Sequence, residues 1–370
     1  MTPEAARGHI RSLTAPPRDH IAYFERVAAS RKYVVFFGAG AVFANGIVDA
    51  WNTWISHPAD FVCDRDPAKW GRLVSGVPCI GPDDLFRMKN DCSVFLSLGA
   101  VGEALDFLSA RGILAMPFYK YDIKYTSRLS PDRLENDSIR LAECYASLYD
   151  DISRNVFDVS VERIFRGLDD AGRMASVYSP DQYFPDDIIR LSPQEAFVDA
   201  GAFDGDTLRD FIRRVDGRFD AYYAFELSRA NYRTLREAID GIADNGRVQA
   251  FEVGLGDAEE NVAYREFQSG SAIGRGDCEG RIDTIDRILA GKRVTFIKMD
   301  IEGYEPKALR GAARTITEQK PVVAACVYHE PAHLWEIPLY LKSLVPGYRI
   351  YLRHHSALEY ETVCYAVPGE

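Results

Sequence analysis

The stretch Phe197-Val198-Asp199-Ala200-Gly201-Ala202-Phe203-Asp204-Gly205-Asp206-Thr207 decides the fold of the second half of this chain. It predicts a buried strand that ends at an acidic residue and continues through a glycine turn into a helix. Glycine permits the tight turn and lets a ligand approach the backbone closely, because it has no Cβ. The carboxylates around the turn favour a ligand with an ammonium or hydroxyl group. A phosphate site more often offers lysine and backbone amides.

Four further apolar runs follow this stretch, and each ends at a polar residue. They are 221–225 before Glu226, 248–255 before Asp257, 294–299 before Asp300, and 321–328 before His329. With the strand at Asp199 they predict a mostly parallel sheet with helices on its faces, closed by an antiparallel pair over 348–353 and 361–367. Ligands bind beyond the carboxyl ends of such strands, so five polar strand ends predict a site at that edge.

The first third of the chain predicts a second, smaller α/β unit. Strand-like runs cover 33–37, 61–64 and 93–97, and a helix is expected through Trp54. Gly38 and Gly40 follow the first run, and Asp64 comes near the position of the ribose-binding acid in a dinucleotide-binding fold. The third glycine of that fingerprint is replaced by Phe43. Ligand binding by this unit, a structural or dimer-forming role, and substrate delivery all remain open.

Composition excludes several classes of function. The net charge of −11 argues against a nucleic-acid-binding protein, because phosphate binding needs a basic surface. No apolar run is long enough to cross a bilayer, and residues 1–18 lack the apolar core of a secretion signal. The seven cysteines are scattered and contain no Cys-x-x-Cys pair, which is typical of buried thiols in a reducing compartment. We therefore expect a cytoplasmic protein with no nucleic-acid or membrane partner.

Several stretches together resemble the FkbM family of S-adenosylmethionine-dependent methyltransferases. Besides 198–207, they are Ala224-Phe225-Glu226, Gly254-Leu255-Gly256-Asp257, Arg281-Ile282-Asp283-Thr284-Ile285-Asp286, Ile297-Lys298-Met299-Asp300-Ile301-Glu302-Gly303-Tyr304-Glu305, Tyr328-His329-Glu330-Pro331, Leu352-Arg353-His354-His355 and Glu361-Thr362-Val363. The resemblance covers roughly residues 183–367. It departs from the family at Leu227-Ser228, where Pro-Asn is more usual. It implies an O-methyltransferase that uses S-adenosylmethionine and acts on a hydroxyl of a small molecule or a sugar.

The predicted organisation therefore has three parts. Residues 1–125 form a Rossmann-like domain, residues 126–182 a helical connector, and residues 183–370 a Rossmann-like methyltransferase domain. The helices of the connector could equally belong to the second domain. Residues 64–78 resemble the small Rossmann-like domains attached to sugar-modifying enzymes. Such domains bind a nucleotide or nucleotide-sugar, or assist assembly, for example of a homodimer.

The resemblance also implies a set of cofactor-binding residues: Asp199, Gly201, Phe203, Gly205, Thr207, Glu226, Asp257 and Asp300. The loop from Gly201 to Gly205 is expected to lie beneath the methionine and ribose. Asp199 is expected to receive the ammonium directly or through water, and Glu226 the ribose hydroxyls. Asp257 is expected near the adenine amino group.

Methyl transfer to a hydroxyl depends largely on positioning, and a base helps to remove the proton. Three groups compete for that role: His329, Asp300, and the pair His354 and His355. Glu302, two positions after Asp300 in the sequence, completes the candidate catalytic set of His329, Asp300 and Glu302, and the same three residues could together hold a divalent cation. Lys298 is interpreted as a salt-bridge partner within the sheet.

Two other functions compete with methyl transfer. A nicotinamide-dependent oxidoreductase would use Gly38 to Asp64, but Phe43 and the more complete acidic loop downstream argue against it. A non-catalytic protein could bind S-adenosylmethionine or a nucleotide without turnover. The presence of Asp300, Glu302 and His329 argues against such an inactive site.

Overall fold

The structure is a computed structural model that describes residues 3–14, 20–40, 42–97, 101–118, 131–166, 172–242, 245–267, 270–274, 276–356 and 360–369. The chain divides into two compact units. The C-terminal unit contains residues 1–9, 139–159 and 176–370, and the N-terminal unit contains residues 10–138 and 160–175. The predicted boundary at 125 lies outside the described residues. The helices of the predicted connector are α7 (Pro131–Ser147), α8 (Asp151–Arg166) and α9 (Gly172–Ala175).

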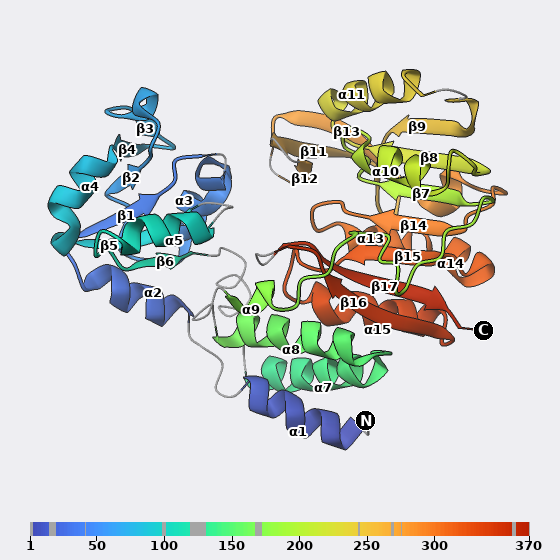
Figure 1. Ribbon diagram of the computed structural model, residues 1–370, viewed down its shortest axis with the longest axis horizontal. Coiled ribbons are helices and arrows are strands. Elements are labelled where there is room, and N and C mark those ends of the chain that lie inside the picture. The colour runs from blue at the N-terminus through green and yellow to red at the C-terminus, as the bar shows by residue number, and fades with distance from the viewer. Residues whose placement is uncertain are drawn as a thin grey trace. The chain divides into compact units, whose positions relative to one another are not determined.

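The C-terminal unit is built on a seven-stranded sheet with the order β16-β17-β15-β14-β7-β8-β9 (Figure 1). Its strands are β7 (Ala196–Ala200), β8 (Ala221–Glu226), β9 (Val248–Glu252), β14 (Phe296–Met299), β15 (Val322–Cys326), β16 (Tyr348–His354) and β17 (Thr362–Pro368). All neighbours pair in parallel except β17, which is antiparallel to both β15 and β16. This confirms the predicted mostly parallel sheet with an antiparallel closing pair.

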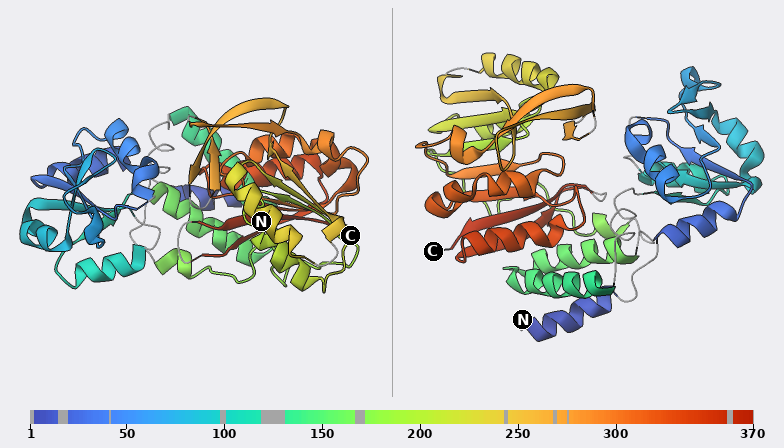
Figure 2. Two further views of the ribbon diagram at one scale, coloured as in Figure 1. Left: turned by 90° about the horizontal axis from the view of Figure 1, so that it is seen from above. Right: turned by 180° about the vertical axis from the view of Figure 1, so that it is seen from behind.

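Helices cover both faces of this sheet, as the two views in Figure 2 show. On one face, α10 (Asp206–Arg214) and α11 (Arg229–Asp240) bury Leu208, Phe211 and Leu235 against Phe197 and Tyr222 of the central strands. The remaining helices of this part are α12 (Ile285–Ile288), α13 (Glu305–Arg310), α14 (Ala313–Gln319) and α15 (His333–Leu344). Burial of these aromatic and aliphatic side chains supplies the main driving force for packing the layers.

The prediction of one strand over 248–255 is wrong. The chain leaves the large sheet after β9, and β10 (Gly254–Leu255) joins a separate four-stranded sheet with β13 (Cys278–Asp283), β11 (Glu260–Phe267) and β12 (Gly270–Ile273). The missing Cβ of Gly254 would lie 3.0 Å from Ile282 and 3.3 Å from Leu227, so glycine allows this close pairing. Asp257 therefore follows β10 and does not end a strand of the large sheet. The second sheet was not predicted, because its strands mix charged residues and glycine with few apolar ones.

The N-terminal unit has a six-stranded sheet with the order β3-β4-β2-β1-β5-β6. The strands are β1 (Tyr33–Phe37), β2 (Phe61–Cys63), β3 (Leu73–Val74), β4 (Val77–Ile80), β5 (Cys92–Leu96) and β6 (Ala115–Pro117). The helices near it in sequence are α1 (Pro3–Thr14), α2 (His20–Ala29), α3 (Val48–Trp54), α4 (Pro82–Met88) and α5 (Val101–Ser109). Phe36, Phe95 and Trp51 form an aromatic core. The three predicted strands are thus confirmed.

Among the described residues, no helix is long and apolar enough to cross a membrane. All seven cysteines are free thiols, and every one except Cys278 is buried. This agrees with their interpretation as small buried groups.

A substitution at Gly201, which follows β7, can test how closely the backbones that follow β7 and β14 approach each other. A Cβ at Gly201 would lie 1.9 Å from the carbonyl oxygen of Asp300, whereas one at Gly217 would meet no described atom within 4 Å. Both residues have positive φ, +79° and +69°. We expect Gly217→Ala to lower the free energy of unfolding by about 1–2 kcal/mol, the cost of a left-handed backbone for alanine. Gly201→Ala should cost more than about 4 kcal/mol, because the backbones must also separate. Urea unfolding would measure both, and equal losses would contradict the close approach.

Candidate functional site

The order of the central strands places a topological switch point between β7 and β14. The chain continues from β7 to β8 on one side, whereas it continues from β14 to β15 on the other. Ligands of open α/β sheets bind in the crevice beyond such a point. Gly201 and Asp300 are the first residues after the two strands, and the amide of Asp300 donates to the carbonyl of Ala200 at 3.0 Å. These residues therefore form the floor of the candidate site.

A buried ion pair joins the two strands directly beneath this floor. Lys298 and Asp199 are register partners on β14 and β7, and Nζ lies 2.9 Å from Oδ1. Lys298 also donates to the carbonyl of Gly201 at 2.7 Å, and Tyr222 donates to the other oxygen of Asp199 at 2.5 Å. The interpretation of Lys298 as a salt-bridge partner is confirmed.

The electrostatics of this pair favour its charged form. Burial alone would lower the pKa of Lys298, but Asp199 and Asp300 raise it. Burial raises the pKa of Asp199, against the lowering effect of Lys298 and Tyr222. A neutral Asp199 would leave the buried ammonium unpaired, so the ion pair is the favoured state. Asp199 is fully enclosed by protein groups, and its predicted contact with the cofactor stays a prediction.

Glu226, the last residue of β8, organises the glycine loop. Its two carboxylate oxygens accept from the amides of Phe203 at 2.9 Å and Ser228 at 2.8 Å. Phe203 and Gly205 have φ of +47° and +85°, which turns the loop before α10 begins. Thr207 lies buried in the first turn of α10. Burial raises the pKa of Glu226, although the two amide donors act in the opposite direction. Each carboxylate oxygen retains a second lone pair for a ligand.

Asp257, a predicted cofactor-binding residue, lies next to the four-stranded sheet and does not end a strand of the seven-stranded sheet. It follows β10, and its carboxylate lies 3.1 Å from the guanidinium of Arg310. Its predicted contact with adenine stays a prediction.

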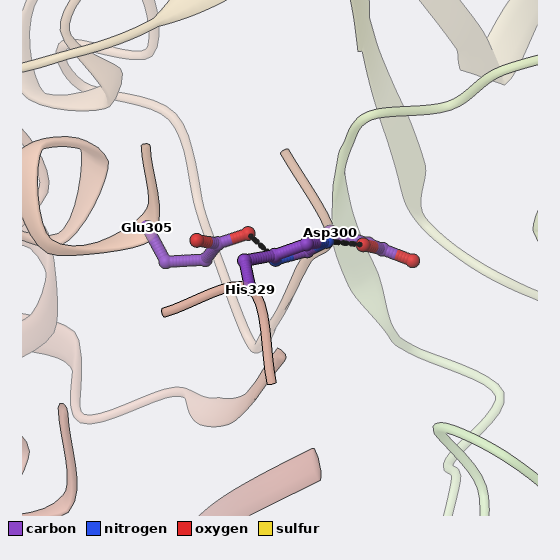
Figure 3. A group of neighbouring side chains, drawn as sticks. All are labelled: Asp300, Glu305 and His329. Carbon is purple, nitrogen blue, oxygen red and sulfur yellow. Dashed lines mark ion pairs between the residues drawn. The ribbon is translucent and has the colours of Figure 1, made fainter. Parts of the chain in front are cut away.

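His329 lies between carboxylates on the other side of the switch point (Figure 3). Its Nδ1 is 2.9 Å from Oε1 of Glu305, and its Nε2 is 3.4 Å from Oδ1 of Asp300 and 3.7 Å from Oε2 of Glu302. His329 and Glu305 are buried, whereas Asp300 and Glu302 are about three-quarters buried. The structure thus brings together the three predicted catalytic residues Asp300, Glu302 and His329.

The turn after β14 creates this arrangement. Glu302 and Gly303 have φ of +55° and +98°, so two consecutive residues are left-handed. Glu305 then begins α13, and its side chain accepts from the amide of Ile301 at 2.9 Å, which closes the turn. A left-handed glutamate is strained, and such strain is common at functional sites.

The charges of this cluster are strongly coupled. Burial alone would lower the pKa of His329, but Glu305, Asp300 and Glu302 raise it to about 10. Burial would raise the pKa of Asp300 and Glu305, but the nearby imidazolium lowers both. Burial raises the pKa of Glu302 to about 7. In this state His329 already carries a proton at neutral pH and cannot accept another, so its predicted role as a base requires that proton to leave first.

Sequence reasoning assigned no role to three residues around Asp300. Tyr183 and Tyr328 donate to its carboxylate at 2.8 and 3.3 Å, and Asp300 raises the pKa of Glu361, which burial already raises. Tyr183 and Glu361 are left-handed, both with φ of +68°. Tyr328 belongs to the motif Tyr328-His329-Glu330-Pro331, so the sequence contained a signal for its place in the site. Tyr183 precedes the first strand in a segment without periodicity, so no signal in the sequence marked it.

His354 and His355 contact residues in and around the closing strands β16 and β17. His354 is fully buried, and its Nδ1 lies 2.8 Å from the hydroxyl of Thr362. His355 bonds the hydroxyl of Tyr365 and the carbonyl of Ser179, each at 2.8 Å, and burial lowers its pKa to about 4. The contacts of both rings are structural.

In the N-terminal unit, the carboxylate of Asp64 already has partners within the protein, in its own loop and in the loop after β1. It accepts from the amides of Ala39 at 2.8 Å and Asp66 at 2.9 Å, and Lys69 lies 3.1 Å away. Gly38 has φ of +110°, which requires glycine. A Cβ at Gly40 would meet no described atom within 4 Å, so nothing in the described structure demands glycine there.

Comparison with known proteins identifies the domain. Residues 199–356 match the methyltransferase FkbM domain. The chain therefore carries a methyltransferase domain of the FkbM family, which confirms the resemblance seen in the sequence. No curated protein gave a match.

One solved structure supports the fold. The crystal structure of methyltransferase FkbM from Methylobacillus flagellatus is similar with a TM-score of 0.74 and 22% identity, over 99% of this chain and 100% of that one. UDP-D-quinovosamine 4-dehydrogenase from Vibrio fischeri aligns with 27% of this chain and 88% of its own, at 20% identity and a TM-score of 0.21. The fibrillarin/Nop5p complex aligns with 49% and 75%, at 14% identity and a TM-score of 0.30. Only the first likeness is strong enough to support the fold.

The raised pKa of Glu302 predicts a pH-dependent stability. The folded state holds a proton that the unfolded state loses, so the contribution of neutral Glu302 is complete below about pH 4.5 and lost as pH rises through about 7. Glu302→Gln cannot ionise. We expect its free energy of unfolding to gain on that of the wild type between pH 5 and 8, by at most about 3 kcal/mol. Denaturant unfolding in buffer with EDTA would measure this, and a constant difference across pH would contradict it.

Proposed function

We propose that the chain transfers the methyl group of S-adenosylmethionine to a hydroxyl of a small-molecule or sugar acceptor. The observation that carries this proposal is the switch point between β7 and β14, where the glycine loop and Asp300 meet at the carboxyl edge of a methyltransferase domain. The proposed binding edge for the cofactor runs from Glu226 through Gly201 to Asp300.

The donor set at this edge fits the proposed cofactor. S-adenosylmethionine carries a sulfonium and an ammonium and therefore favours an anionic surrounding. Glu226, Asp300, Glu302 and Glu361 all belong to or approach this edge, and the buried Lys298 is neutralised by Asp199. When bound, the sulfonium would supply an activated methyl group with a neutral leaving group.

The proposed roles of the residues follow from their hydrogen bonds. Glu226 would accept from the ribose hydroxyls with the lone pairs left over from Phe203 and Ser228. The loop from Gly201 to Gly205 would allow close approach of the cofactor. Tyr183 and Tyr328 fix the carboxylate of Asp300, which makes Asp300 the better-placed proton acceptor for the hydroxyl of the acceptor molecule. Positioning would supply most of the rate, because a carboxylate of lowered pKa is a weak base.

The methyltransferase domain favours this function over the nicotinamide-dependent alternative. A non-catalytic binding protein differs in one measurable respect, since it would bind the cofactor without turnover. A cytoplasmic location, the absence of nucleic-acid and membrane partners, and assembly as a homodimer are part of the proposal and rest on the composition and motifs of the sequence.

The first test concerns Glu226. We expect calorimetry to show one S-adenosylhomocysteine bound per chain. Glu226→Gln should weaken binding by about 1–3 kcal/mol, because one oxygen acceptor is replaced by a donor. Glu252→Gln is a matched control: Glu252 is the register partner of Glu226 on β9, but it is exposed and paired with Arg229 at 2.8 Å. It should change the affinity less than about twofold. Equal effects of the two variants would remove Glu226 from the site.

For the N-terminal unit we propose binding of a nucleotide or nucleotide-sugar at the loop after β1. The support is Gly40, whose lack of a side chain is not required by any described neighbour. Glycine at such a position leaves the backbone accessible to a ligand.

This second proposal predicts a separable effect. Nucleotides or nucleotide-sugars should raise the melting temperature of the full chain, and Gly40→Val should abolish that shift because its side chain would occupy the ligand's place. Binding of S-adenosylhomocysteine should be unchanged in Gly40→Val. If nucleotides, nucleotide-sugars and nicotinamide cofactors all leave the wild-type melting temperature unchanged, the unit has no such ligand.

A further inference from the structure

The arrangement around His329 carries an inference beyond the methyl donor. Asp300, Glu305 and His329 place one donor atom each within 4.8 Å of one another. Figure 3 shows, however, that Glu305 and Asp300 lie at opposite nitrogens of the imidazole ring. Glu305 is thus the carboxylate nearest Nδ1 and Asp300 a carboxylate next to Nε2, so an ion bound at Nε2 would lie on the side of Asp300.

The side of Nε2 offers a different set. Oδ1 of Asp300 and Oε2 of Glu302 lie 3.4 and 3.7 Å from Nε2. A direct charge-assisted hydrogen bond would be about 2.7–2.9 Å long. Two ligand atoms that share an ion at about 2.1 Å each lie roughly 3.4 Å apart in tetrahedral geometry. The distances from Nε2 to these two carboxylate oxygens are thus close to those between neighbouring ligands of one ion.

A metal-binding histidine needs a partner at its second ring nitrogen to orient the imidazole, and here Glu305 lies next to Nδ1. Oε1 of Glu305 lies 2.9 Å from Nδ1, and Glu305 is itself fixed by the amide of Ile301. Metal-binding histidines almost always direct their second nitrogen to a carboxylate or carbonyl, which sets the tautomer and orientation. Both ring nitrogens of His329 are buried and neither has a hydrogen bond of regular geometry among the described residues, and Nε2 lies next to the two carboxylates.

We propose that Asp300, Glu302 and Nε2 of His329 bind a divalent first-row transition metal, with Glu305 as the positioning residue. The ligand set, one imidazole and two carboxylates, suits Mn²⁺ or Zn²⁺ better than Mg²⁺ or Ca²⁺, which prefer oxygen alone. The role of the bound ion in catalysis, lowering the pKa of an acceptor hydroxyl so that its proton leaves more readily, rests on the proposed function.

The test uses the full chain after treatment with EDTA. Titration with Mn²⁺, followed by loss of the electron paramagnetic resonance signal of the free ion, should show one ion bound per chain. Pulsed measurements should detect an imidazole nitrogen on that ion. Zn²⁺ should compete for the site.

Four variants then assign the residues. Glu302→Gln, on the most exposed of the three ligands, and His329→Gln should each weaken Mn²⁺ binding at least about 100-fold, and His329→Gln should remove the nitrogen signal. Glu305→Gln should weaken binding about 10–100-fold while the nitrogen signal persists, as expected for a residue that acts through the ligand. His57→Gln is the control, because His57 forms an exposed pair with Glu25 at 3.0 Å in the other unit, and it should have no effect.

Calorimetry with S-adenosylhomocysteine in EDTA separates the two proposals. If the nucleoside binds but the wild type takes up neither Mn²⁺ nor Zn²⁺, or retains Mn²⁺ in both Glu302→Gln and His329→Gln, the metal site is overturned and the proposed function stands. If Mn²⁺ binds as described and S-adenosylhomocysteine does not, the metal site stands and the proposed function falls.

Discussion

The buried pair of Lys298 and Asp199 is the interaction on which the candidate site depends. It links the two central strands at the point where their connections diverge, and the same ammonium holds the carbonyl of Gly201 at 2.7 Å. Removing one partner of a buried pair is costly, because the other charge stays without compensation. The pair therefore fixes the start of the glycine loop relative to Asp300, and the close approach of Gly201 to the carbonyl of Asp300 completes the join.

The two sides of the switch point differ in electrostatic character. On the side of β8, Glu226 is a buried carboxylate satisfied by two backbone amides, which is a rigid acceptor of further hydrogen bonds. On the side of β15, His329 lies among carboxylates that raise its pKa. The side of β8 is suited to accepting hydrogen bonds from a ligand, and the side of β15 to handling protons or cations. In the proposed reaction, the methyl donor and the acceptor would approach this edge from different sides.

Several features were predictable from local sequence. Runs such as Phe197-Val198 and Phe296-Ile297 predicted buried parallel strands, and the motif from Lys298 to Glu305 indicated the family and placed Asp300 at a strand end. The strand over 248–255 was predicted wrongly because periodicity cannot show that Gly254 leaves one sheet for another. That change depends on Ile282 and Leu227, which pack against Gly254 from elsewhere in the chain.

The sequence by itself determined the α/β class, the glycine loop and the residue types at the sheet edge, because strand pattern and turn chemistry are local properties. Only the tertiary structure decided what those residues do to one another. It buried Asp199 in an ion pair with Lys298, and it placed Glu305 and Asp300 next to different nitrogens of His329. It also brought His355 within hydrogen-bond distance of the hydroxyl of Tyr365. Protonation states and contacts of this kind depend on distances and burial between segments far apart in the chain. No local pattern contains that information.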